Sequence, residues 1–404
     1  WSRLIEWPLL LVGHWVIPLA TFLGFFLTSI FVFGILKKVL NLEIQILQSF
    51  VLLFLIVPVN HARISIIVFD YTSSYFLFFL GWLILVRYRS NKNFIFSWLV
   101  LFLSLKTHSL LFFVLLPFLH FVWLDKDVLK NSKKLRAVHV EVFLIALLPI
   151  TYLLLRKLFW PPTKDWTDYH QVTSAGLRVA LLPIVIGLVP LVFIAMRKAK
   201  NLSVNFGLTL LVVGFLVTAL ALFPYFAGDL YVGYAGRPAY LTVFEFRADW
   251  RSRHQLLMPL GLALSVVGLN ELFNWRKKNF VFVATVALSV TLNMFWGSQY
   301  FLMSHKQEQL VELFATTKNK IEIASVEDQA MQFNGRGASF RSYEWNGFMT
   351  LADISTGRPG CEALPSGTAL TLKSNTPYLK ALVTRDLGLY FEVKPCSEVL
   401  AENG

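Results

Sequence analysis

The feature that most constrains this chain is a succession of apolar segments that recur up to about residue 302 and then stop. A helix needs roughly 20 apolar residues to cross a hydrocarbon core about 30 Å thick, because it rises about 1.5 Å per residue. We therefore predict a polytopic α-helical membrane protein with about ten transmembrane helices. Their predicted ranges are 16–36, 44–60, 66–86, 94–105, 108–124, 140–157, 178–196, 204–223, 255–273 and 280–301.

The point at which these segments stop divides the chain into two predicted domains. Residues 1–302 form the transmembrane domain, and residues 303–404 form a polar C-terminal domain. Hydrophobic residues make up 56% of the chain, above the roughly 45–50% typical of soluble proteins. The first residue is Trp1 rather than Met, and no charged segment with a cleavage site follows it. We therefore expect the chain to lack its true N-terminal start.

The C-terminal domain carries the patterns of both helix and strand. Residues 308–314 are apolar at helical spacing, whereas residues 320–324, 369–373 and 389–393 alternate as strands do. Proline and glycine at 358–360 and 365–367 mark turns. These patterns predict a small α/β domain.

The fourth and fifth predicted spans are short and meet at residues 105–108. Two helices of half length, joined by a tight turn below the membrane surface, would satisfy their own backbone hydrogen bonds. The sequence therefore leaves open a re-entrant pair at this point.

Clusters of lysine and arginine predict which loops face the cytoplasm, because short loops rich in these residues stay on that side. Alternate loops carry such clusters, at residues 37–38, 87–92, 126–136, 197–200 and 276–278. This alternation places the C-terminal domain outside the cytoplasm, together with the loops near residues 60–63, 106, 158–177 and 223–254. Topology thus accounts for much of the net charge of +13, and no compact basic domain indicates nucleic-acid binding.

The two cysteines, Cys361 and Cys396, both lie in the domain that the topology places outside the cytoplasm. Oxidising compartments permit disulfides, so topology and cysteine position agree. We predict a Cys361–Cys396 disulfide, which would stabilise the fold by roughly 3–4 kcal/mol in the chain-entropy model.

The loop at residues 223–254 is the richest candidate site, because it is too polar for lipid and joins two apolar segments. Its arginines and histidine would hold a phosphate or diphosphate through charge-assisted hydrogen bonds, and a carboxylate such as Asp229 would orient a hydroxyl group. The basic candidates are Arg237, Arg247, Arg251, Arg253 and His254. The alternative is that Arg251 and Arg253 only anchor the next helix at the lipid headgroups.

Further basic residues lie at two other predicted outer positions. Arg63 and Asp70 are seven residues apart and so share one helix face, which fits either a structural ion pair or a basic group for a lipid phosphate. Lys106 and His108 lie at the tip of the short helices, where a lysine at reduced membrane depth needs a partner.

The predicted outer loop at residues 158–177 combines acidic and aromatic side chains. Aromatic faces suit pyranose rings, and the carboxylates Asp165 and Asp168 suit hydroxyl groups, so the loop is a candidate sugar site. The alternative is an interfacial loop with aromatic residues at headgroup level.

Motifs of soluble enzymes and metal sites, such as H-E-x-x-H, G-x-S-x-G and the phosphate-binding loop, do not occur in the chain. The layout instead resembles bacterial membrane glycosyltransferases of the GT-C class, on the placing of Arg63, Lys106, His108 and the 224–254 loop and on the outer C-terminal domain. The resemblance implies transfer of a sugar from a polyprenyl-phosphate carrier to an acceptor outside the cytoplasm. It also implies a catalytic carboxylate in the first outer loop, where Glu6 is the one carboxylate present.

From this resemblance we expect an enzyme of the bacterial inner membrane and cell envelope. The outer basic residues would bind the carrier phosphate, and an acidic residue, either upstream of Trp1 or among Asp165, Asp168 and Asp229, would activate a glycan, lipid or protein acceptor. No cofactor is indicated, although a divalent metal ion stays open. The alternatives are a polymerase or ligase of lipid-linked polysaccharides, and a non-catalytic subunit that docks a protein partner through its C-terminal domain.

Overall fold

The computed structural model describes residues 16–39, 43–59, 69–87, 90–117, 132–159, 174–199, 205–227, 255, 257–273, 279–317, 323–330, 342–352 and 360–403. The chain separates into two compact units, Trp1–Val290 and Thr291–Gly404. The domain boundary predicted at residue 302 lies inside helix α15 (Phe280–Thr317), which runs without a break and has residues in both units.

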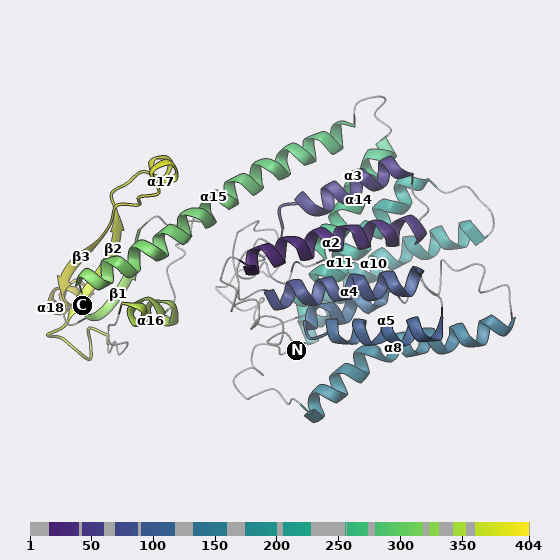
Figure 1. Ribbon diagram of the computed structural model, residues 1–404, viewed down its shortest axis with the longest axis horizontal. Coiled ribbons are helices and arrows are strands. Elements are labelled where there is room, and N and C mark those ends of the chain that lie inside the picture. Colours follow the sequence, from purple (N-terminus) through teal and green to yellow (C-terminus); the bar gives the residue numbers. More distant parts are fainter. Residues whose placement is uncertain are drawn as a thin grey trace. The chain divides into compact units, whose positions relative to one another are not determined.

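The described part of the first unit is helical (Figure 1). Every predicted span overlaps one of its helices or the start of α15. The elements before α15 are α2 (Val16–Val39), α3 (Ile44–Ile56), α4 (Phe69–Arg87), α5 (Asn91–Ser104), the 3-10 helix η3 (His108–Val114), α8 (Ser132–Phe159), α10 (Ser174–Ala199), α11 (Phe206–Ala227) and α14 (Met258–Phe273).

Five helices within the described residues are long and apolar enough to cross a membrane. They comprise Val16–Val39, Phe69–Arg87, Val140–Phe159, Phe206–Phe223 and Phe280–Thr316. Shorter apolar helices occur at Ile44–Ile56, Leu181–Ile194 and Met258–Phe273. A mostly helical fold with membrane-spanning capacity is thus confirmed, whereas the count of about ten spans stays a prediction.

Aromatic side chains fill the centre of the first unit, where α2, α3 and α4 pack together. Tyr75 on α4 is fully buried and lies against Phe25 of α2 and Phe54 of α3, with ring centroids 5.3 and 6.3 Å away. Phe78 and Phe79 continue this cluster along α4. Buried rings of this kind hold α4 firmly, which fixes the residues at its N-terminal end.

Helices α11 and α14 approach closely because glycines line both sides of their contact. Gly207 and Gly214 on α11 are seven residues apart and face Gly268 and Gly261 on α14, so the helices run antiparallel. A Cβ atom at Gly214 would lie 2.6 Å from the amide nitrogen of Ser265 and 2.8 Å from the carbonyl oxygen of Gly261. Small residues at such positions let helix backbones pack tightly in lipid.

The second unit contains a three-stranded sheet with strand order β1-β2-β3. Strand β1 (Ile323–Asp328) runs parallel to β2 (Thr368–Ser374), and β2 runs antiparallel to β3 (Leu389–Pro395). The C-terminal part of α15 and helix α16 (Ser342–Leu351) bury Phe314 and Trp345 against this sheet. The small α/β domain predicted near the C-terminus is confirmed by this sheet and its helices.

Two short helices complete the described part of the second unit. Helix α17 (Tyr378–Thr384) lies in the connection between β2 and β3, and α18 (Cys396–Asn403) follows β3. Across the β2–β3 ladder, a hydrogen bond with Glu392 raises the pKa of Lys373, and the same bond lowers the pKa of Glu392. This ion pair adds to the pairing of the two strands.

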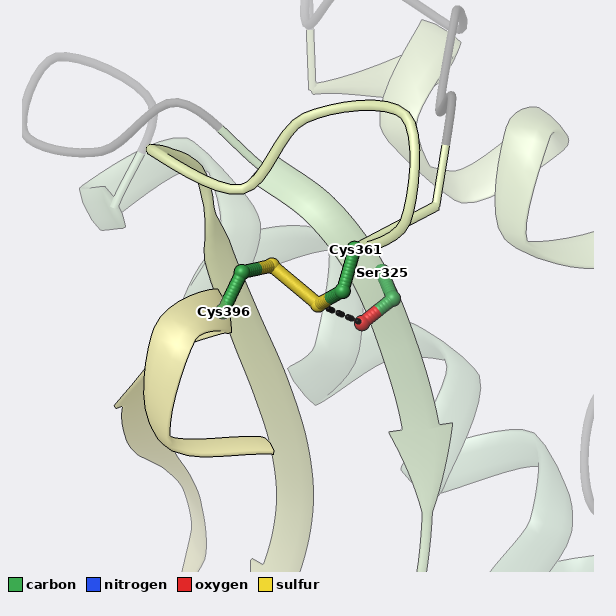
Figure 2. Close-up of a disulfide and its surroundings, with 3 residues drawn as sticks. All are labelled: Ser325, Cys361 and Cys396. Atoms are coloured by element: carbon green, nitrogen blue, oxygen red, sulfur yellow. Dashed lines mark hydrogen bonds between the residues drawn. A yellow bond between two sulfur atoms is a disulfide. The ribbon is translucent and has the colours of Figure 1, made fainter. Parts of the chain in front are cut away.

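The predicted disulfide between Cys361 and Cys396 is present (Figure 2). Its Cα atoms lie 5.1 Å apart, and the Cys361 sulfur lies 3.6 Å from the Ser325 hydroxyl oxygen on β1. The amide of Cys396 donates a hydrogen bond to the carbonyl of Gly367. The bridge therefore ties the segment before β2 to the start of α18.

Candidate functional site

An ion pair joins helix α4 to the turn after α5 at one end of the first unit. The Lys106 ammonium donates a hydrogen bond to the Asp70 carboxylate, with Nζ and Oδ2 2.6 Å apart. Both side chains are half-buried, at 36% and 32% exposure. A charge at membrane depth costs a few kcal/mol when it faces lipid, so the pairing stabilises both groups there.

The helical hairpin of α4 and α5 explains why these two residues meet. Helix α4 ends at Arg87 and α5 begins at Asn91, so the two helices run antiparallel from a short connection. Asp70 and Lys106 lie 17 and 15 residues from those two helix ends, which corresponds to about 26 and 23 Å. They therefore reach the same level at the far end of the hairpin.

The helix termini at this level of the hairpin favour a negative charge at Asp70 and a positive charge at Lys106. Asp70 lies in the first turn of α4, where the positive end of the helix dipole stabilises a carboxylate. Lys106 follows the C-terminus of α5, where the negative end of the helix dipole favours an ammonium group. After Lys106, buried Thr107 accepts a hydrogen bond from the Leu110 amide as η3 begins. The local backbone thus holds the lysine in a turn between two helices.

The end of α11 packs against η3, directly beyond this turn. The rings of Phe112 on η3 and Phe223 on α11 have centroids 3.7 Å apart, and Phe113 packs against Phe78 of α4. Helix α11 ends four residues after Phe223, at Ala227. Helix α11 therefore ends on the side of the first unit that carries Lys106 and Asp70.

Most predicted site residues lie outside the described part of the chain. His108 begins η3, and the described partner of Asp70 is Lys106, so the predicted Arg63–Asp70 pair stays a prediction. The other predicted residues beyond the described ranges are Glu6, Arg63, Asp165, Asp168, Asp229, Arg237, Arg247, Arg251, Arg253 and His254. Within the described ranges, no group of three His, Cys, Asp or Glu side chains is placed to hold a metal ion.

Sequence reasoning missed a buried ion pair in the second unit. Lys306 on α15 is 1% exposed, and its ammonium group lies 2.8 Å from both oxygens of Asp328 and 2.5 Å from the carbonyl oxygen of Ala330. These contacts satisfy the three donors of the ammonium group. Asp328 also accepts a hydrogen bond from the Ala330 amide. The pair is closed to a ligand and fastens α15 to the end of β1.

The fold and this site define a class of protein: a helical protein with several helices able to span a membrane, a half-buried ion pair at one end of its helical unit, and a disulfide-bonded α/β unit. Comparisons with protein-family models, with curated proteins and with solved structures find no match to the chain.

Proposed function

We propose that this protein is a membrane glycosyltransferase of GT-C type, which moves a sugar from a polyprenyl-phosphate carrier to an acceptor on the extracytoplasmic side. Lys106 would bind the carrier phosphate together with basic residues of the 228–254 segment. The proposal rests on one observation above all, namely the half-buried Lys106–Asp70 ion pair on the side of the helical unit where α11 ends.

The chemistry of this arrangement suits a lipid phosphate. A lysine ammonium is a compact charge with three donors, so it can contact a phosphate oxygen while it keeps its bond to Asp70. Phe112 on η3, six residues after Lys106, is exposed and offers an apolar surface for an isoprenoid chain. A site of this kind binds an anionic headgroup and an apolar tail at the same time.

The proposed reaction has a simple balance. An acceptor hydroxyl oxygen forms a bond to the anomeric carbon of the sugar, while the bond from that carbon to the carrier phosphate oxygen breaks. The hydroxyl proton passes to a carboxylate, for which Asp165, Asp168 and Asp229 are the proposed residues. The electron pair stays on the departing phosphate, whose charge the basic residues stabilise.

Binding of polyprenyl phosphate to the full chain in nanodiscs tests the proposal. We expect Lys106→Gln to weaken this binding about tenfold or more, because a hydrogen bond to a charged group contributes roughly 1.5–3 kcal/mol. Lys92→Gln is the matched control, since Lys92 is an exposed lysine in the first turn of α5, at the opposite end of that helix. Equal affinity of the two variants would refute the role of Lys106.

The double variant Asp70→Asn with Lys106→Gln separates binding from folding. It removes both charges of the described pair together, so the protein should stay folded while binding remains weak. Release of free polyprenyl phosphate from sugar-loaded carrier, in the presence of acceptor, then tests catalysis. Binding without release would favour the non-catalytic subunit, and release accompanied by growing polymer chains would favour the polymerase.

A further inference from the structure

Helix α17 in the second unit exposes large apolar side chains that the fold does not cover. Leu379 and Val383 are 75% and 83% exposed, and their spacing of four residues places them on one helix face. Ala381 on the opposite face, together with Leu382 at its side, packs in a cluster with Leu302 of α15. The helix therefore has a buried face on α15 and an apolar face without a partner among the described residues.

Polar contacts fix α17 against one stretch of α15. The hydroxyl groups of Tyr378 and Ser298 lie 2.6 Å apart, and Gln309 binds the turn after α17 through the Arg385 carbonyl and the Leu387 amide. The Arg385 guanidinium group also lies 5.8 Å from the centroid of the Phe301 ring. In Figure 1, α17 lies at the end of the β2–β3 hairpin.

This stretch of α15 is where a membrane-spanning helix would leave the bilayer. Helix α15 begins at Phe280, and about 20 residues at 1.5 Å each cross a core of about 30 Å, which ends near residue 300. Exposed apolar side chains continue along it through Met294, Phe295 and Phe301. Half-buried Tyr300 is of a residue type that concentrates at headgroup level.

We propose that Leu379 and Val383 insert into the headgroup boundary of the bilayer that α15 crosses, so that α17 is a second membrane contact of the C-terminal unit. The occupant of this face is a lipid surface. Its two apolar residues are flanked by exposed Lys380 and Arg385, whose positive charge suits lipid phosphates. The neighbouring carboxylate of Asp386 accepts a hydrogen bond from the Gly388 amide. This inference does not depend on the proposed enzymatic function.

A spin label at Val383→Cys in the full chain tests the proposal. Both native cysteines are held in the disulfide, so the introduced thiol is labelled alone. The protein is placed in nanodiscs of phosphatidylcholine and phosphatidylglycerol, and collisions of the label with oxygen and with a water-soluble nickel complex are measured. We expect oxygen access to exceed nickel access at residue 383.

Val393→Cys is the matched control, because Val393 is an exposed apolar residue on β3, about 13 Å along the strand from its α17 end. Its label should show the reverse ratio. A label at residue 383 with the same nickel access as at 393 would overturn the proposal. A label shielded from both reagents would overturn it as well, since it would show that protein covers this face.

Discussion

The buried ion pair of Lys306 and Asp328 allows the sharpest prediction at the scale of single residues. Lys306→Met leaves the Asp328 carboxylate buried without its charged partner, which typically costs roughly 3–5 kcal/mol. We expect the second unit to lose its protection from hydrogen exchange along β1 in the full chain. The double variant Lys306→Met with Asp328→Leu should recover much of the loss, because apolar replacements of both partners are often neutral. Hydrogen-exchange rates along β1 that are the same in Lys306→Met as in the wild-type protein would contradict this account.

The candidate site shows how far single residues could be predicted from the sequence. Lys106 and Asp70 were each recognisable as charges at the ends of apolar segments, and the topology placed both on one side. Their pairing was not predicted, because the expected partner of Asp70 was Arg63, on the same helix face seven residues away. The described partner, Lys106, is 36 residues away in the sequence and depends on the α4–α5 hairpin, whose geometry brings both to one level, while the Arg63–Asp70 pair stays a prediction.

At the scale of elements, the glycines between α11 and α14 predict a strong dependence on side-chain size. Gly214→Ala places a methyl group within 2.6–2.8 Å of the α14 backbone, so the two helices must move apart. We expect a loss of roughly 1–3 kcal/mol in the free energy of unfolding, measured by denaturant titration in detergent micelles. Gly297→Ala is the control, because its added Cβ meets nothing within 4 Å and alanine favours the helix. An equal response of both variants would contradict the packing argument.

Helices and strands could be predicted from the sequence wherever a segment keeps a single hydrophobic period, either helical or alternating. The predicted spans overlap helices, and the strands predicted at 369–373 and 389–393 lie inside β2 and β3. The length of α15 exceeds the prediction, because the change from an apolar span to the amphipathic residues 308–314 predicts two separate helices. No proline or glycine lies between them, so nothing interrupts the backbone hydrogen bonds, and the helix continues to Thr317.

At the scale of the whole molecule, the disulfide bears on the cellular compartment in which the C-terminal unit lies. The structure shows the bond between Cys361 and Cys396, and the pattern of lysines and arginines places these residues outside the cytoplasm. The two arguments are independent, because one rests on geometry and the other on charge. Cytosolic reductants usually keep thiols reduced, so the bond and the charge pattern both favour the predicted extracytoplasmic side.

Thiol labelling in intact cells tests this topology. The native cysteines should resist a membrane-impermeant maleimide before and after permeabilisation, and they should react only after reduction and unfolding. Ser90→Cys adds an exposed thiol to the connection between α4 and α5, which the basic residues at 87–92 place in the cytoplasm. It should react only once the cells are permeabilised. Labelling of Ser90→Cys in intact cells would indicate the opposite topology. Lys106 and the C-terminal unit would then lie on the cytoplasmic side, away from an extracytoplasmic acceptor.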